Sequence, residues 1–418
     1  MSKKSRTILF FILTFTFLIV APIIVFYSEG YRFDFKTGKI LETGGFFIKT
    51  YPGEANILIN DKKESKTSNF SRTLLIQNLT PKTYNLKIFK EGYLPWEKNL
   101  EIVEKKVSEI DITLFKTKYD KVLNIENILD IYKTNNGFIF KKETGFYYYN
   151  PENSKEELIT KNIVWDSFEI LKNDILAIKN QKYFLINNTG IKEFNNIGQI
   201  NFKKDDLNNL YYQINDRLYK NNELVKTSIQ SYEVHNNAIY YFRDGFLYKE
   251  DAKLNNEKFA FDRIKDYKLL FIYNKIFLNE NNEKLYLLDD NQFKKILDLN
   301  NHLEYSEWDG KIIFNSGNEI WVYFSKEVYY PEFIPKNTLK LLARFGSDIK
   351  NLSFINDKYY IFTKAEELTI SEFDYRDKIN MFTIATNLNN SKIFFNYENK
   401  NIYIFENNNL YAINKIIQ

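Results

Sequence analysis

The longest uninterrupted apolar stretch of the chain lies close to its N-terminus. Residues 7–27 contain no charged side chain and are rich in Phe, Ile and Leu. About 20 such residues in an α-helix, at roughly 1.5 Å per residue, span a hydrocarbon core of roughly 30 Å. The stretch also lacks the polar face that a surface helix of a soluble domain would carry. We therefore predict a transmembrane helix over residues 7–27.

The residues that flank this stretch predict its orientation. Three basic side chains lie within residues 1–6, and only Glu29 and Arg32 follow the stretch closely. The positive-inside rule then makes residues 1–6 a cytoplasmic stub and places the remainder outside a single-pass membrane anchor. The alternative is a cleaved signal peptide, which has an apolar core of about 7–15 residues followed by small residues. Bulky Phe26 and Tyr27 favour the uncleaved anchor.

After an expected linker at residues 28–43, the pattern becomes that of short β-strands. Between residues 44 and 116, apolar side chains recur at every second position, as at Ile57 and Ile59, and turn residues separate the runs. This alternation is typical of strands that bury one face. About seven such strands in so short a region predict a small β-sandwich.

The turns of this region carry a series of motifs in a fixed order. They are Pro52-Gly53-Glu54-Ala55, Ile57, Ile59, Asp61, Leu79, Pro81, Tyr84, Gly92-Tyr93 and Trp96. This stretch resembles a PEGA domain, although Gly and Glu are exchanged in the signature turn and Lys82-Thr83 stands where Gly is usual. The resemblance implies a surface-exposed sandwich of bacteria or archaea that serves adhesion or interaction, without catalytic residues.

One unit recurs through residues 119–418. It contains a short strand, a turn rich in Asn, Asp or Gly, an aromatic strand, another polar turn, and a strand in which an apolar residue usually precedes an aromatic one. The last element recurs at Phe146-Tyr147, Tyr183-Phe184, Leu218-Tyr219, Leu247-Tyr248, Leu285-Tyr286, Ile320-Trp321, Leu368-Thr369 and Leu410-Tyr411. The mean spacing is close to the roughly 40 residues of a four-stranded propeller blade.

The repeats predict a β-propeller of about eight blades. Seven is the alternative, because the unit around Leu368 is irregular and the interval before it is long. The last unit ends near Ile413 without an outer strand, and residues 121–125 could supply it. Pairing the first and last strands in one blade would close the ring without a free sheet edge.

Composition supports an all-β fold and excludes several classes of function. The chain has 37 Phe and 31 Tyr but only 14 Gly and 7 Pro, so Asn must supply many of the tight turns. It contains no Cys, which excludes disulfides and thiolate metal sites. A net charge of only +4, without a sustained basic stripe, does not indicate a nucleic-acid partner.

The residues most often found at metal or catalytic sites are isolated in this sequence. His235 and His302 are the only histidines, and the acidic pairs Asp205-Asp206 and Asp289-Asp290 fall in expected turns. We therefore predict no metal site, no cofactor and no catalytic residues. Two carboxylates brought together by a propeller could still form a glycosidase site.

The tryptophans allow two interpretations. Trp165, Trp308 and Trp321 could stack on sugars, but aromatic side chains also fill the space between propeller blades. A ligand would bind where the loops of the ring converge at its central face, and no individual residue can be assigned there from the sequence.

These features together predict a membrane-anchored binding protein of the prokaryotic cell envelope. Its partner would be another envelope protein or a polysaccharide, recognised by a rigid ring held near the membrane. A glycan-processing enzyme and a scaffold for envelope protein assembly are the alternative functions.

Overall fold

A computed structural model of the chain describes residues 3–34, 38–134, 136–161, 165–171, 174–180, 182–187, 190–194, 201–262, 265–300 and 302–416. The first two residues of the expected stub, residues 35–37 of the expected linker and residues 417–418 of the expected propeller lie outside the described residues. Contacts divide the chain into two compact units. The first contains Met1–Lys118 and Ser371–Ile384, and the second contains Tyr119–Ile370 and Ala385–Gln418.

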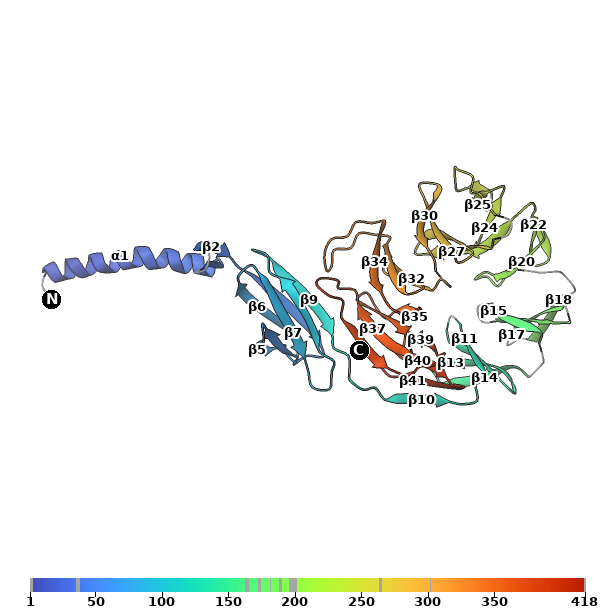
Figure 1. Cartoon of the computed structure of the whole chain (residues 1–418), viewed down its shortest axis with the longest axis horizontal. Helices are drawn as coiled ribbons and strands as arrows, with labels where there is room; N and C mark the ends of the chain where they lie inside the picture. The colour runs from blue at the N-terminus through green and yellow to red at the C-terminus, as the bar shows by residue number, and fades with distance from the viewer. Residues whose placement is uncertain are drawn as a thin grey trace. The chain divides into compact units, whose positions relative to one another are not determined.

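A single α-helix is present among the described residues, and every other regular element is a strand. Helix α1 (Lys3–Ser28) lies at the N-terminal end of the chain (Figure 1) and contains Pro22. Its large apolar side chains are exposed. Its portion Ser5–Ser28 is long and apolar enough to cross a membrane, and none of that portion is buried. The expected all-β fold with one N-terminal apolar helix is thus confirmed.

A short hairpin follows the helix within the region expected to be a linker. Its strands β1 (Tyr31–Asp34) and β2 (Lys39–Glu42) pair antiparallel. The Arg32 guanidinium lies 3.5 Å from the centre of the Tyr27 ring and donates to the Tyr27 carbonyl at 2.8 Å. The hairpin therefore folds back against the last turn of α1.

Seven strands then form two sheets of a β-sandwich. The first sheet has the order β6-β3-β9, with β3 (Gly44–Tyr51), β6 (Thr73–Leu79) and β9 (Val107–Thr113). The second has the order β5-β4-β7-β8, with β4 (Asn56–Ile59), β5 (Lys62–Lys66), β7 (Thr83–Phe89) and β8 (Trp96–Glu101). Alternate side chains point inward, so Phe46, Ile57, Leu86 and Ile110 are fully buried between the sheets.

Eight further four-stranded sheets occur among the described residues and are arranged around a ring (Figure 1). The first four are β11 (Asp130–Lys133), β12 (Phe138–Lys142), β13 (Gly145–Asn150), β14 (Lys155–Lys161); β15 (Ser167–Leu171), β16 (Asp174–Lys179), β17 (Lys182–Asn187), β18 (Gly190–Phe194); β19 (Asn201–Lys204), β20 (Leu210–Ile214), β21 (Arg217–Lys220), β22 (Glu223–Lys226); and β23 (Ser231–His235), β24 (Ala238–Arg243), β25 (Phe246–Lys249), β26 (Ala252–Lys253).

The remaining four complete the ring. They are β27 (Tyr267–Ile272), β28 (Lys275–Glu280), β29 (Lys284–Asp289), β30 (Gln292–Asp298); β31 (Tyr305–Trp308), β32 (Lys311–Ser316), β33 (Glu319–Phe324), β34 (Thr338–Arg344); β35 (Ile349–Phe354), β36 (Tyr359–Lys364), β37 (Glu367–Glu372), β38 (Met381–Ala385); and β39 (Lys392–Phe395), β40 (Ile402–Glu406), β41 (Asn409–Ile413), β10 (Lys121–Ile125). Eight blades are therefore present, rather than the alternative seven.

The last sheet is closed by a strand from the beginning of the unit, as the repeat pattern predicts. Strand β10 pairs antiparallel with β41, placing Leu123 opposite Ala412 and Ile125 opposite Leu410. The sheet thus contains both the first and the last strand of the ring, and no blade edge is left open at the join.

Asn residues make many of the hairpin turns of the ring. Asn236 and Asn237 have φ angles of 48° and 62°, and Asn281 and Asn282 have φ angles of 51° and 54°. Two consecutive residues with positive φ form the type I′ turn that matches the twist of a hairpin. Asn tolerates this conformation, which explains how the fold manages with so few glycines.

Neighbouring sheets of the ring pack through apolar side chains. One cluster joins Ile139 and Phe146 of one sheet to Ile175, Ala177 and Ile186 of the next. The aromatic residues found by the repeat analysis belong largely to such clusters, so their main role is to hold the blades together.

The long interval before the repeat around Leu368 has a structural explanation. Strand β33 ends at Phe324 and β34 begins at Thr338, so residues 325–337 join them, and Val328 and Ile334 form a bridge within this connection. The extra residues therefore lie between two strands of the preceding blade. The segment Ser371–Ile384, which includes the end of β37 and most of β38, belongs to the first compact unit.

Candidate functional site

The innermost strands of the ring line two polar cavities. The larger has a volume of about 720 Å³ and is bordered by Glu169 of β15, Lys203 of β19, Glu233 of β23 and Lys268 of β27. These four residues come from four consecutive sheets. A volume in this range suits a small molecule or the end of a polymer chain.

One ion pair crosses the larger cavity wall. The Lys203 ammonium lies 3.0 Å from the Glu233 carboxylate, and both side chains remain partly exposed. This pair joins β19 to β23, and Glu169 of β15 borders the same cavity. Burial raises the pKa of Glu169, although Lys203 acts in the opposite direction. Within the described part of the chain, no hydrogen bond or ion pair engages the Glu169 carboxylate.

Tyrosine and amide side chains complete the polar lining. Tyr232 and Tyr267 border the larger cavity together with Gln213, Asn215 and Gln230. Burial raises the pKa of Tyr232 well above its ordinary value, so its phenol stays neutral and can donate a hydrogen bond. The lining thus combines charged, amide and phenol groups.

The smaller cavity has a volume of about 390 Å³ and is bordered by residues in or beside the innermost strands β11, β31, β35 and β39. Lys133, Glu304 and Tyr305 are among them. Burial raises the pKa of Tyr305, and the carboxylates of Glu307 and Glu233 raise it further.

Partly desolvated charged groups also border the smaller cavity. The Glu304 carboxylate accepts a hydrogen bond from the Leu352 amide at 2.8 Å, yet burial raises the pKa of Glu304. Burial lowers the pKa of Lys133. Ionised groups in such surroundings are poorly solvated, so a ligand that bonds them loses little in displacing water.

Hydrogen bonds between innermost strands hold this wall in place. The Phe354 amide donates to Ser306 Oγ at 3.0 Å, which joins β35 to β31. The Ile393 amide donates to Asn351 Oδ1 at 3.1 Å, which joins β39 to β35. The cavity lining therefore belongs to a rigid framework, as preformed ligand sites usually do.

The ring is also joined where its first and last sheets meet. Lys392 of β39 lies 2.6 Å from the Asp130 carboxylate of β11, and Tyr132 donates to the same carboxylate at 2.7 Å. Burial would raise the pKa of Asp130, but the hydrogen bonds from Lys392, Tyr132 and the Ile131 amide outweigh it and lower the pKa. This contact supplements the β10–β41 pairing.

The motif residues that lie in or beside turns of the sandwich are Pro52, Gly53, Glu54, Ala55, Asp61, Gly92 and Tyr93. Gly53 has no room for a side chain, since a Cβ atom would lie 2.7 Å from the Ser68 carbonyl oxygen. The Ala55 amide donates to Thr67 Oγ1 at 3.1 Å. Pro52 and Glu54 complete the same turn, where Glu54 has a φ of 58°.

The other motif residues also stabilise the backbone. Asp61, with a φ of 62°, lies in the turn between β4 and β5. Gly92 has a φ of 80°, and its carbonyl accepts from the Thr117 amide at 3.0 Å. Tyr93 forms a bridge with Lys116. Each of these contacts fixes a turn.

The histidines and acidic pairs are separate from one another in the structure. His235 stacks on Phe271 with ring centres 4.5 Å apart, and His302 is exposed. Asp205 accepts hydrogen bonds from the Leu207 and Asn209 amides and closes a turn. No group of three or more potential metal ligands occurs among the described residues.

Asp206 and Asp290 also lie in turns, and Asp289 is the last residue of β29. The Asp206 amide donates to Asn237 Oδ1 at 3.1 Å. Asp289 and Asp290 share Lys294 at 2.9 and 3.0 Å.

The tryptophans of the ring pack against protein groups. Trp308 stacks on Tyr397, with ring centres 5.4 Å apart. Trp321 donates to Glu319 at 2.8 Å. Trp165 packs against the cluster formed by the first two blades. Sequence reasoning missed the residues of the cavities, because period and spacing place a strand in a blade but do not show which of its polar residues border a cavity.

Comparison with curated protein sequences gives no significant match. Among solved structures, virginiamycin B lyase from Staphylococcus aureus is similar at 11% identity, covering 71% of this chain and 99% of that chain with a TM-score of 0.40. A eukaryotic initiation factor matches at 12% identity over 70% and 90% of the two chains, with a TM-score of 0.43. Likeness this weak carries no argument, so the architecture rests on the strand order itself.

A protein-family comparison adds an independent result for the first unit. The matched region begins one residue before β3 and ends five residues after β9, and so includes the whole sandwich. The motif-based resemblance is thereby confirmed: residues 43–118 match the PEGA domain family.

Proposed function

We propose that this chain is a membrane-anchored binding protein of the prokaryotic cell envelope, and that the ring binds a polysaccharide. The observation that carries the proposal is the larger cavity, where Glu169, Lys203 and Glu233 stand beside tyrosines and amides. Hydroxyl-rich ligands are bound by such mixtures of hydrogen-bond donors and acceptors. The interface of a protein partner would more often centre on an exposed apolar or aromatic cluster.

The proposal uses the organisation predicted from the sequence. Residues 1–6 would remain in the cytoplasm, residues 7–27 would cross the membrane, and residues 28–43 would connect the anchor to the sandwich at 44–116 and the ring at 119–418. The length and exposure of α1 support this arrangement. Protease added to intact cells should then remove the large C-terminal portion and leave a cytoplasmic marker protein intact.

The binding experiment uses the full chain in detergent micelles. We expect it to bind members of an array of bacterial surface polysaccharides. The Lys268→Ala variant should bind them at least about tenfold more weakly, since losing one hydrogen bond to a charged group costs roughly 1.5–3 kcal/mol. Lys295→Ala is the matched control, because Lys295 pairs with Asp298 on an outer strand. Equal binding by both variants would contradict a ligand site in the cavity.

An envelope-protein partner is the other outcome of this experiment. A pull-down from an envelope extract that retains one fixed protein, together with a silent polysaccharide array, would favour the interaction or scaffold function. Lys268→Ala should then be compared with the wild type for that protein, since a partner held elsewhere on the chain would not respond to the change.

A glycan-processing enzyme is the second candidate function. Burial raises the pKa of both Glu169 and Glu304, and glycosidases use a carboxylic acid with a raised pKa as their general acid. New reducing ends in a polysaccharide incubated with the chain, absent with Glu169→Gln, would favour the enzyme. Binding without cleavage would favour the leading proposal.

A further inference from the structure

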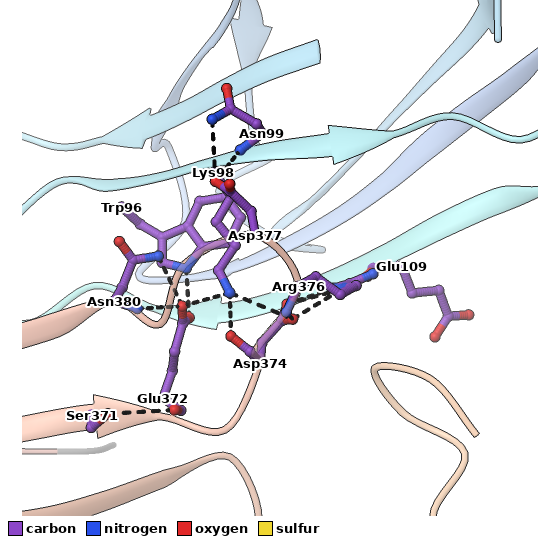
Figure 2. Close-up of polar contacts among 10 residues, drawn as sticks. All are labelled: Trp96, Lys98, Asn99, Glu109, Ser371, Glu372, Asp374, Arg376, Asp377 and Asn380. Carbon is purple, nitrogen blue, oxygen red and sulfur yellow. Dashed lines mark hydrogen bonds and ion pairs between the residues drawn. The ribbon is translucent and has the colours of Figure 1, made fainter. Parts of the chain in front are cut away.

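A cluster of charged side chains lies buried in the first compact unit (Figure 2). Its centre is Lys98 of β8, which has no exposed surface. The Lys98 ammonium lies 2.8 Å from one carboxylate oxygen of Glu372 and 3.5 Å from the carboxylate of Asp374. It also donates to the backbone carbonyl of Asp374.

Two neighbouring residues of β8 also contact acidic side chains. Trp96 donates its indole N–H to Glu372 at 2.7 Å, and the Asn99 amide donates to Asp377 at 2.8 Å. Figure 2 shows Trp96 and Lys98 converging on Glu372, and it shows Asn99 bonded to Asp377. One strand of the sandwich therefore binds three carboxylates of the segment Ser371–Ile384.

Hydrogen bonds and an ion pair within the segment fix its conformation. Asn380 donates through its backbone amide and its side chain to Glu372, each at 2.8 Å, which closes residues 372–380 into a loop. Arg376 lies 2.6 Å from Asp374 and donates to the Glu109 carbonyl of β9 at 3.1 Å. The loop thus presents its acidic groups to β8 and its guanidinium to β9.

An apolar contact accompanies the polar ones. The rings of Phe382, in the segment, and Phe115, just after β9, lie 5.1 Å apart, and both are buried. Aromatic pairs at this distance stabilise an association beyond the area they bury. The segment is therefore held by an apolar anchor as well as by charge.

The chemistry of β8 indicates that this surface is suited to an acidic ligand. Alternation along the strand places Lys98 on the inward face with Trp96 and Leu100, where a charge is costly unless it is paired. Among the described residues, the carboxylates that pair with Lys98 all belong to the segment. Without an acidic occupant, this lysine would face an apolar surface with no counter-ion.

We propose that the surface formed by Trp96, Lys98, Asn99 and the Glu109 carbonyl is an acidic-peptide site, and that residues 372–377 are its built-in occupant. The site selects carboxylates at the first, third and sixth positions of the peptide, as at Glu372, Asp374 and Asp377. The binding role that a PEGA domain implies is met here within the chain itself. This role is independent of any ligand of the ring.

The first test replaces residues 372–380 of the full chain by a Gly/Ser linker of equal length, which empties the site. A fluorescent peptide of residues 370–381 should bind this linker variant at least about tenfold more tightly than the wild type, a difference of about 1.4 kcal/mol. Adding Lys98→Met to the linker variant should remove that gain. Lys87→Met, which alters an exposed lysine of β7, should leave it unchanged.

The peptide supplies its own control. A control peptide with Gln in place of Glu372 and Asn in place of Asp374 and Asp377 should not bind. Binding of both peptides alike, or equal binding by the linker variant with and without Lys98→Met, would overturn the proposal. Failure of the linker variant to bind either peptide, with its unfolding curve intact, would overturn it as well.

A second measurement does not require the linker variant to fold. Trypsin can cleave after Arg376, which is bonded in the loop, and after the exposed Lys378. Lys98→Met in the full chain should accelerate cleavage after Arg376 by about tenfold or more relative to the wild type, because opening of the loop controls access. Equal rates in wild type, Lys98→Met and Lys87→Met would contradict the built-in occupant.

Discussion

The two charged sites of this protein are built from the same residue types but differ in their exposure to solvent. In the sandwich, the Lys98 and Glu372 side chains are 0% and 3% exposed. In the ring, Lys203 and Glu233 form a pair of similar length whose side chains are 25% and 17% exposed. The first site is closed by a segment of the chain, whereas the second stays open to a cavity.

This difference shows how burial decides what a charged group can do. A buried ion must have its bonds satisfied by protein, because water cannot reach it. The cluster around Lys98 meets that requirement and has no capacity left for an external ligand. A group such as Glu169 is partly desolvated but still accessible, which is the condition in which a ligand can compete with water.

The largest expected effect comes from removing the buried positive charge of Lys98, which tests the contrast between the closed and the open site. Lys98→Met leaves Glu372 and Asp374 without their shared counter-ion in a buried site, so we expect the first unit to lose about 3–5 kcal/mol of unfolding free energy. Urea unfolding of wild type and variant measures this loss. Trypsin cleavage within residues 371–384 reports when the first unit has unfolded. Lys87→Met should cost no more than about 1 kcal/mol, because the Lys87–Glu97 pair is exposed.

A loss of less than about 1 kcal/mol in Lys98→Met would mean that water already reaches the cluster. The two sites would then differ in composition only, and the comparison between a closed and an open site would fail.

The sequence predicted the architecture well because periodicity reports burial. Period-two alternation located the sandwich strands, and the recurring aromatic strand located the blades. Residues 121–125 were expected as the outer strand of the last blade, and β10 indeed pairs with β41. These features depend only on local patterns and on the need to bury apolar faces.

The candidate sites were less predictable because they depend on contacts between distant residues. Lys98 and Glu372 lie 274 residues apart in sequence yet form one ion pair. One signal was visible: in the strand around Trp96 and Leu100, the inward position between them holds a lysine. A charge at an inward position predicts a buried partner, but nothing in the sequence names it.

The next largest effect is expected at a motif residue of the sandwich. Gly53→Ala places a Cβ atom 2.7 Å from the Ser68 carbonyl and 3.2 Å from the Asn69 carbonyl, so the backbone must shift. We expect a loss of about 1–3 kcal/mol, as is typical of overpacking. Thermal unfolding of the full chain measures it. Gly92→Ala, at a φ of 80° with open space around it, provides a control in which only backbone strain is added.

A smaller effect is expected where the ring is joined. Asp130→Asn removes the charge that pairs with Lys392, and since both side chains are about a third or more exposed we expect a loss of about 1 kcal/mol or less at pH 7. The folded-state pKa of Asp130 is lowered, so its contribution is present above its unfolded value of about 3.9 and is lost as pH falls through the folded pKa. The stability difference between wild type and variant should therefore shrink below pH 4.

If the stability difference between wild type and Asp130→Asn were the same at pH 7 and pH 3, the effect would come from altered hydrogen bonding with Tyr132 and not from the ion pair. Lys295→Met, which breaks an exposed pair with Asp298, serves as the reference for a charge change outside the join.

The smallest effect on stability, and the sharpest test of the open site, is expected from Glu169→Gln. Burial raises the folded-state pKa of Glu169, so its ionised form opposes folding once pH exceeds the unfolded value of about 4.3. The variant should equal the wild type near pH 4 and exceed it by no more than about 0.5 kcal/mol at pH 7, since the side chain is exposed to the cavity. Polysaccharide binding should nevertheless weaken, because the carboxylate accepts hydrogen bonds on both oxygens and the amide on one. A variant that is destabilised at pH 7 while binding normally would show that Glu169 belongs to the framework of the ring, like Lys98 in the sandwich, and not to an open site.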